Sequence, residues 1–170
     1  MPVADSFLSA NWLGDEPVFD CATVPAAVRS FAHALTTDSI GRRTGVLWLS
    51  PAAYEASPQW ATHCLGLVPR HLGREVAAAC EAQGTQRVPA TASALLRHVY
   101  AGHTAATWLW GLDGLLTHLS PVEREVFWAS LFDLRQRPPL LLALSQTYHE
   151  FGPTDPARWL QAEPLRGLEV

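Results

Sequence analysis

The stretch Gly45–Ser50, which reads Gly-Val-Leu-Trp-Leu-Ser, is a continuous apolar run that ends in a polar residue. Leu140–Ser145 repeats this pattern, and Ala105–Leu112 is a mostly apolar run that is followed by Asp113. A run without polar and apolar alternation is typical of a strand that is buried on both faces. Three such strands separated by helical segments predict an α/β fold, in which a small parallel sheet lies between two layers of helices.

The segments around these strands have helical spacing and helix-start signals. Ser50-Pro51, Ser57-Pro58 and the capping box Ser120–Glu123 each place a capping side chain before a proline, which needs no N–H in the first turn. Val18–Cys21 is a candidate for a short edge strand. The pattern predicts helices over residues 24–36, 51–56, 58–66, 73–83, 90–101 and 121–136, and a last short helix after Asp155-Pro156.

The chain has the size and composition of one domain. It has 170 residues, of which 48% are hydrophobic and 16% charged, which is enough apolar material for a core. No internal repeat or linker divides it. We therefore expect a single domain over 1–170, with an irregular N-terminal arm (1–23), an α/β core (24–150) and a C-terminal tail with a short helix (151–170).

The basic residues exclude several kinds of chemistry. All twelve are arginine, and the chain contains no lysine, so a Schiff-base lysine, a Ser-Lys dyad and a P-loop lysine are excluded. The net charge is −4, and only Arg42-Arg43 and the pair Arg135/Arg137 stand close together. Because neutralising several phosphates needs a basic face, nucleic acid is disfavoured as the main ligand.

Targeting signals and cysteines favour a cytoplasmic location. No apolar run approaches the ~20 residues that a membrane span needs. Met1–Asp5 has no basic region before an apolar stretch, so we expect no signal peptide. Cys21, Cys64 and Cys80 are odd in number and lack C-x-x-C spacing, which favours three reduced thiols. We expect no membrane contact.

The order of the segments resembles that of P-loop NTPases with a RecA/AAA-like core, over about residues 24–150. In that family a first strand leads into a loop G-x-x-x-x-G-K-[ST], whose N–H groups cradle phosphate. Gly45–Leu49 stands in place of this strand, and residues 50–57 occupy the loop positions.

Two later strands extend the resemblance. Asp113 follows an apolar strand and looks like the aspartate of a Walker B motif, which helps to hold magnesium. Leu140–Leu144 is followed by Ser145 and Gln146 and looks like a sensor strand. The resemblance implies that Ser57, Asp113 and Ser145 are the cofactor-binding positions.

The sequence differs from the family at the positions that bind phosphate and catalyse hydrolysis. Ser50 replaces the first glycine of the loop, Glu55 the second and Ala56 the lysine. Glu55 puts a carboxylate where phosphate would lie, and two unit charges ~4 Å apart repel by roughly 4 kcal/mol at an effective dielectric constant of 20. Gly114 follows Asp113, so the adjacent catalytic glutamate is also absent. We therefore expect a degenerate Walker A motif, no hydrolysis and no cofactor.

The length and layout are also similar to the small P-loop subunits of BREX-type phage-defence systems in bacteria. This resemblance implies a non-hydrolysing subunit whose partner is a protein or another copy of the chain. The seven tryptophans are consistent with such contacts, because aromatic residues and arginine are enriched at interfaces. The candidate interface residues are Trp12, Trp60, Trp128 and Trp159, with Arg135 or Arg158. These residues either form an exposed patch or fix the terminal segments to the core.

Two other functions stay open. One is a regulator that binds a nucleotide through unusual contacts without hydrolysing it. The other is a small hydrolase that uses Ser50, Asp113 and His149, in the chain order of α/β-hydrolases, although the elbow G-x-S-x-G is missing. None of the seven histidines has the spacing H-x-x-x-H, so we expect no metal site.

Overall fold

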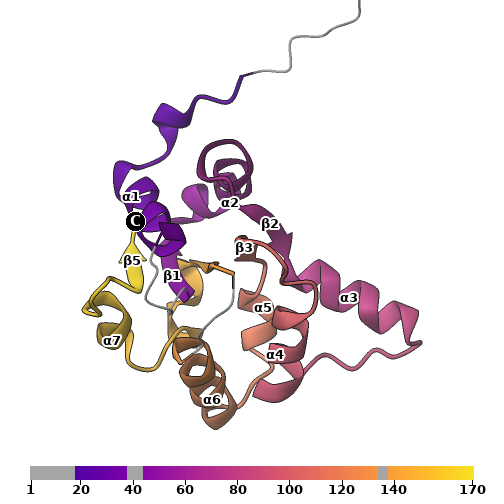
Figure 1. Cartoon of the computed structure of the whole chain (residues 1–170). Helices are drawn as coiled ribbons and strands as arrows, with labels where there is room; N and C mark the ends of the chain where they lie inside the picture. Colours follow the sequence, from indigo (N-terminus) through magenta and orange to yellow (C-terminus); the bar gives the residue numbers. More distant parts are fainter. Residues whose placement is uncertain (1–17, 38–43, 134–137) are drawn as a thin grey trace, which may run out of the picture.

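The centre of the molecule is a sheet of five parallel strands (Figure 1). The computed structural model describes residues 18–37, 44–133 and 138–170. The strand order is β2-β3-β4-β1-β5, so β4 lies between β1 and β3. This confirms the α/β class and the parallel sheet. The strands are β1 (Thr44–Leu49), β2 (Val68–His71), β3 (Thr107–Trp110), β4 (Leu140–Ser145) and β5 (Gly167–Glu169).

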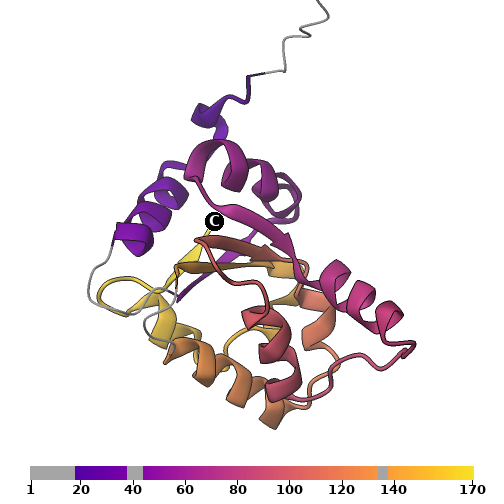
Figure 2. The same cartoon turned by 45° about the vertical axis from the view of Figure 1, so that its right-hand side comes forward.

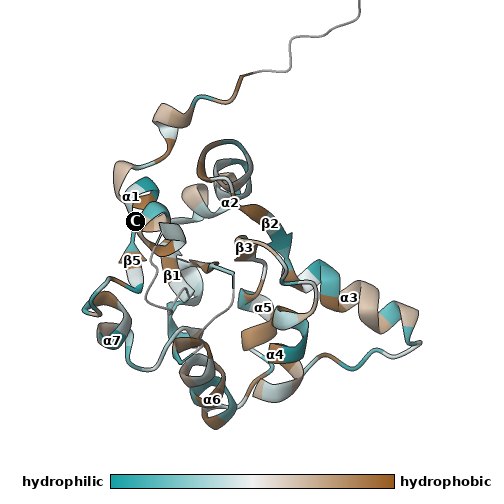
Figure 3. Cartoon of the chain, viewed as in Figure 1, coloured by the Kyte–Doolittle hydropathy of each residue, from teal (hydrophilic) through white to brown (hydrophobic). Residues whose placement is uncertain are grey.

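Helices cover both faces of the sheet, and Figure 2 shows α1 and α2 on one side and α4 and α6 on the other. In Figure 3 brown and teal residues alternate along these helices, as expected for helices with one apolar face. The helices are α1 (Ala26–Thr37), α2 (Pro51–Trp60), α3 (Leu72–Ala82), α4 (Ala92–Tyr100), α5 (Asp113–Leu116), α6 (Pro121–Phe132) and α7 (Pro156–Leu160). Shorter turns are the 3₁₀ segments η1 (Cys21–Thr23) and η3 (Gln146–Phe151) and the π-helical segment η2 (Ala61–Leu65).

Alternate residues of each central strand pack into opposite layers. Leu47 and Leu49 of β1 belong to the core on the α1 and α2 side. Val46 and Trp48 belong to the core formed with α3, α4, α5, α6 and α7. Side chains of a strand point to opposite faces in turn, so a sheet covered on both faces needs apolar residues at every position. This is why these strands are continuous apolar runs.

The two outer strands were not predicted from the sequence. β2 contains Pro69, Arg70 and His71, and it pairs only with β3 among the described residues, so it lacks the apolar run of a central strand. β5 has three residues and pairs with β1, which makes the end of the C-terminal tail part of the sheet. The suggested strand Val18–Cys21 is wrong, because its last residue begins the 3₁₀ turn η1.

The two helices expected over 51–56 and 58–66 form one helix, α2, that continues into the wider turn η2. Pro58 lies inside α2 and has no N–H to donate to the carbonyl of Tyr54. The Ser57 hydroxyl donates to that carbonyl instead, at 2.8 Å. This side-chain bond explains how the helix passes a proline. The predicted helix over 121–136 ends earlier, at Phe132, and residues 134–137 lie outside the described part.

A disulfide joins Cys21 of η1 to Cys64 of η2, so the expectation of three reduced thiols is wrong for this pair. The two cysteines are 43 residues apart in the chain, and their pairing depends on the packing of the N-terminal segment against η2. Cys80 is free and half-buried. Within the described ranges, no helix has the length and apolarity to cross a membrane.

Candidate functional site: a pocket at the carboxyl edge of the sheet

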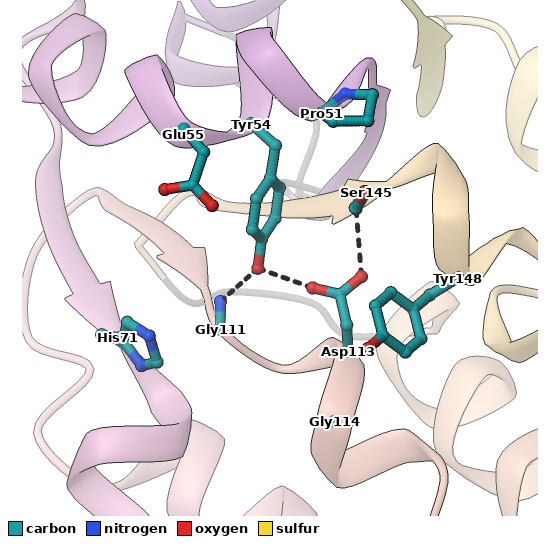
Figure 4. Close-up of a pocket in the computed structure, with 9 residues that line it drawn as sticks. All are labelled: Pro51, Tyr54, Glu55, His71, Gly111, Asp113, Gly114, Ser145 and Tyr148. Atoms are coloured by element: carbon teal, nitrogen blue, oxygen red, sulfur yellow. Dashed lines mark hydrogen bonds between the residues drawn. The ribbon is translucent and has the colours of Figure 1, made fainter.

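A pocket of about 350 Å³ opens at the carboxyl ends of the strands, where parallel sheets bind ligands. Four chain segments that are far apart in sequence form it: the start of α2, the end of β2, the turn from β3 into α5, and the end of β4 with η3. Figure 4 shows its nine lining residues, which are Pro51, Tyr54, Glu55, His71, Gly111, Asp113, Gly114, Ser145 and Tyr148.

The connection from β1 to α2 contains one residue. β1 ends at Leu49, Ser50 caps α2, and Pro51 is the first helical residue. The Ser50 hydroxyl accepts a hydrogen bond from the backbone N–H of Ala53 at 3.4 Å. The positions compared with a phosphate-binding loop, residues 50–57, therefore lie almost entirely within a helix. A helix directs its N–H groups along its own axis and does not form the wide cradle of a P-loop.

Tyr54 and Asp113 form the centre of the site. The Tyr54 hydroxyl donates to Asp113 Oδ2 at 2.6 Å and accepts from the backbone N–H of Gly111 at 2.8 Å. The other oxygen of Asp113, Oδ1, accepts from the backbone N–H of Ser145 at 3.0 Å. Figure 4 shows the Tyr54 side chain reaching from α2 to the strand ends. These bonds tie α2 to β3 and β4.

Burial controls the protonation of both groups. Asp113 is 5% exposed, and its burial raises the pKa of the carboxyl group, although the hydrogen bonds from Tyr54 and Ser145 act in the opposite direction. Burial also raises the pKa of Tyr54, and the hydrogen bond to Asp113 raises it further. Tyr54 therefore stays a neutral phenol at physiological pH and acts as a hydrogen-bond donor to the carboxylate.

His71 and Gly111 form the wall next to β2. His71 Nδ1 accepts from the backbone N–H of Arg74 at 3.2 Å and caps α3, so a neutral His71 carries its proton on Nε2. Its ring lies against Trp110, with centroids 4.4 Å apart. Gly111 has φ of +69°, and a Cβ there would lie 2.2 Å from Cε1 of His71. Both the backbone conformation and the lack of space require glycine.

The structure brings together only some of the residues singled out from the sequence. Asp113 and Ser145 line the pocket. Ser57 is completely buried, and its hydroxyl accepts from Trp108 Nε1 at 3.2 Å, so it faces the core. Tyr54, His71, Gly111 and Tyr148 were not singled out. Tyr54 depends on the register of α2 and His71 on the unpredicted strand β2, whereas Gly111 lies in the turn after β3 and Tyr148 in the 3₁₀ segment η3.

The suggested hydrolase residues do not form a triad. Ser50 is engaged as a helix cap, and Asp113 accepts from Tyr54 and Ser145. His149 Nε2 lies 4.0 Å from Glu169 Oε1, outside the pocket lining. No hydrogen bond among the described residues links any two of Ser50, Asp113 and His149. In the same part of the chain, no group of three or more His, Cys, Asp or Glu residues is placed to hold a metal ion.

The three candidate tryptophans that lie within the described residues are buried and form no exposed patch. Trp60, Trp128 and Trp159 are each 5% exposed or less, and Trp12 and Arg135 lie outside the described residues. Arg158 covers the ring of Phe132 at 3.9 Å from its centroid. These aromatic residues hold the terminal segments on the core, which was the other interpretation of their number.

The fold and the site together define an α/β protein with a parallel five-stranded sheet and a polar pocket at its carboxyl edge. Comparison with protein-family models, with curated proteins and with solved structures finds no match.

Proposed function

We propose that the chain is a non-catalytic, P-loop-like domain that works through protein contacts, as a subunit of a larger bacterial complex or as a homo-oligomer. The sheet order supports this proposal, because β4 lies between β1 and β3, an order that is compatible with a RecA/AAA-like core. The positions compared with the first, Walker B and sensor strands are β1, β3 and β4, and all three end at one pocket.

The observation that carries the proposal is the hydrogen bond between Tyr54 and Asp113. In a P-loop NTPase the corresponding aspartate helps to hold magnesium beside the phosphates. Here the Tyr54 hydroxyl lies 2.6 Å from Asp113 Oδ2, and the Ser145 N–H binds the other oxygen. The protein's own side chain therefore takes the place of a metal-bound ligand, and displacing it would leave the Gly111 N–H without this partner.

Two further features act against a nucleotide. The single-residue connection at Ser50 provides no loop around a phosphate group. Glu55 lines the pocket with a carboxylate, and among the described residues it has no ion-pair partner to neutralise it. Coulomb repulsion therefore opposes the entry of phosphate.

The setting that we propose is a bacterial assembly such as a BREX-type phage-defence complex, on the basis of the similarity in length and segment order. Co-expression with the products of neighbouring genes, followed by size-exclusion chromatography with light scattering, tests the protein contacts directly. A stable complex or a homo-oligomer is the expected result. A monomer that forms no complex with those products would contradict this part of the proposal.

Nucleotide titrations test the loss of P-loop chemistry. We expect no change in Tm with millimolar ATP or GTP, with or without magnesium, and no ATP turnover. A ligand at 100 times its Kd would stabilise the fold by about 2.7 kcal/mol, which is easily measured. The variants Glu55→Gln and Glu55→Gln/Ala56→Lys remove the carboxylate and then add a cation. Both should still fail to bind, because the missing loop is not restored.

One alternative has an observation in its favour. The pocket lies where parallel sheets bind ligands and has room for a small molecule, which is compatible with a non-hydrolysing nucleotide-binding regulator. Magnesium-dependent stabilisation by a nucleotide without turnover would favour that function over ours. Binding that appears only in Glu55→Gln would show that repulsion alone, and not the shape of the junction, keeps nucleotides out.

A further inference from the structure

The charges of the pocket are opposite to those of a phosphate site. Its lining includes the carboxyl groups of Glu55 and Asp113, whereas no arginine lines it among the described residues, and the chain has no lysine. His71 is the one lining residue of a basic type within the described part of the chain. The field in the pocket therefore favours a cation and opposes an anion.

The hydrogen-bond acceptors of the two carboxylates lie on both sides of the Tyr54 ring. Figure 4 shows the Glu55 carboxylate on one side of the Tyr54 ring and the Asp113 carboxylate on the other. Asp113 accepts from the Tyr54 hydroxyl through Oδ2 and from the Ser145 N–H through Oδ1, and a carboxylate has about four acceptor sites in all. Glu55 is exposed and without an ion pair within the described residues, so its acceptors are available.

A guanidinium group matches this arrangement better than an ammonium group does. It is flat, carries five N–H donors that point in several directions, and stacks on aromatic rings. An ammonium group is a compact point charge and is more strongly hydrated. The pocket offers separated acceptors, the rings of Tyr54 and Tyr148, and a volume of about 350 Å³.

We infer that the pocket binds a guanidinium group, presented by an arginine side chain of the partner protein. This inference rests on the proposed function, in which the degenerate site is used for a protein contact. The single-residue junction at Ser50 and the carboxylate of Glu55 then have one explanation: this edge of the sheet accepts a cation and not a phosphate.

The test uses the full chain labelled with ¹⁵N and small probes of one shape. N-acetyl-arginine-methylamide is the probe, and the corresponding citrulline compound is its neutral isostere. We expect the arginine probe to shift the backbone amide signals of Gly111 and Gly114, which line the pocket, and the citrulline probe to leave them unchanged. Equal shifts with both probes, or no shift with arginine, would overturn the inference.

Variants locate the binding and compare two carboxylates. Glu55→Gln should weaken binding of the arginine probe by roughly twofold to fivefold, the upper part of the range of a solvated ion pair. Glu81→Gln, an exposed glutamate of α3 outside the pocket lining, removes the same charge and should leave the affinity unchanged. Equal affinity in wild type and Glu55→Gln would contradict the inference.

Two further measurements complete the test. The first distinguishes a partner's arginine from a free small cation, and the second distinguishes the inferred contact from the proposed function. Free methylguanidinium lacks the stem and peptide groups of the arginine probe, so a partner's arginine predicts that it binds more weakly; equal affinities would indicate a free small-molecule cation and would contradict the inferred source. ATP in place of the cation tests the proposed function alone. If neither ATP nor the arginine probe binds, the non-catalytic assignment stands and only the inferred contact fails.

Discussion

The inside of the sheet and its carboxyl edge are built by different rules. Inside, strands β1, β3 and β4 bury almost every side chain, and burial of apolar surface supplies the stability. At the edge, Tyr54, Asp113 and the N–H groups of Gly111 and Ser145 are joined by specific hydrogen bonds. Most positions inside therefore tolerate another apolar residue of similar volume, whereas the edge depends on particular atoms.

The inside of the sheet and its edge also contribute differently to stability and to binding. A side chain in the core makes many apolar contacts, and truncating it removes the share of the stabilising energy that those contacts supply. A hydrogen-bonded carboxylate in a pocket contributes less to stability, but it decides which charge the pocket accepts. Substitutions in the two regions should consequently differ in size and in what they change.

The largest effect is expected inside the sheet. Leu142→Ala removes a completely buried side chain at the centre of β4 and should lower the free energy of unfolding by about 3–5 kcal/mol. Urea unfolding measures this loss. Val126→Ala, at a half-exposed position on α6, is the control and should change stability by less than about 0.5 kcal/mol. A loss below about 1 kcal/mol for Leu142→Ala would show that the inside is not packed as described.

Gly111→Ala tests the position of the edge at which both the space and the backbone conformation require glycine. An added Cβ meets His71 Cε1 at 2.2 Å, and φ is +69°. We expect a loss of about 2–4 kcal/mol from backbone strain and overpacking together. In a double-mutant cycle, His71→Ala should recover the steric part and leave the strain, so the two losses should not add. Additive losses would mean that His71 and Gly111 do not press on each other.

Tyr54→Phe should cost about 1–3 kcal/mol, because it leaves Asp113 Oδ2 and the Gly111 N–H without their shared partner. Tyr148→Phe removes the same hydroxyl from a residue that is 38% exposed, whose hydroxyl has no hydrogen bond within the described residues, and should be close to neutral. Thermal and urea unfolding of the two variants give the comparison. Equal effects would remove the special role assigned to Tyr54.

The sequence predicts the inside of the sheet better than its edges. β1, β3 and β4 were predicted because a strand that is covered on both faces has apolar residues at nearly every position, which gives a continuous apolar run in the sequence. β2 was missed because Pro69, Arg70 and His71 belong to an outer strand, and β5 because its three residues carry too little signal. Helix starts at Ser50 and Ser120 followed from local capping chemistry, which depends on neighbouring residues alone.

The site was predicted in part for the same reason. Asp113 and Ser145 follow buried strands, so they were expected at the edge. Tyr54 gains its role only when α2 begins one residue after β1, which turns its side chain towards Asp113. The pairing of Cys21 with Cys64 likewise depends on segments that meet only in three dimensions. Contacts of this kind have no local pattern in a single sequence.

Asp113→Asn should have the smallest effect on stability and the clearest effect on its pH dependence. Asparagine can still accept from the Ser145 N–H, so the free energy of unfolding should change by about 1 kcal/mol or less near neutral pH. The folded state raises the pKa of Asp113, so it holds this proton more tightly than the unfolded chain does. The contribution of Asp113 is therefore fully present below the unfolded value of about 3.9 and is lost as pH rises through the folded pKa.

The difference between the two proteins isolates this one group, because all other titrating groups are shared. We expect Asp113→Asn to gain stability relative to wild type as pH rises from ~4 towards ~7, in urea unfolding at a series of pH values. A difference that is flat with pH would mean that Asp113 ionises as easily in the folded chain as in the unfolded one. A difference of opposite slope would mean that the hydrogen bonds from Tyr54 and Ser145 outweigh burial, and the edge would then be prepared to hold a permanent negative charge.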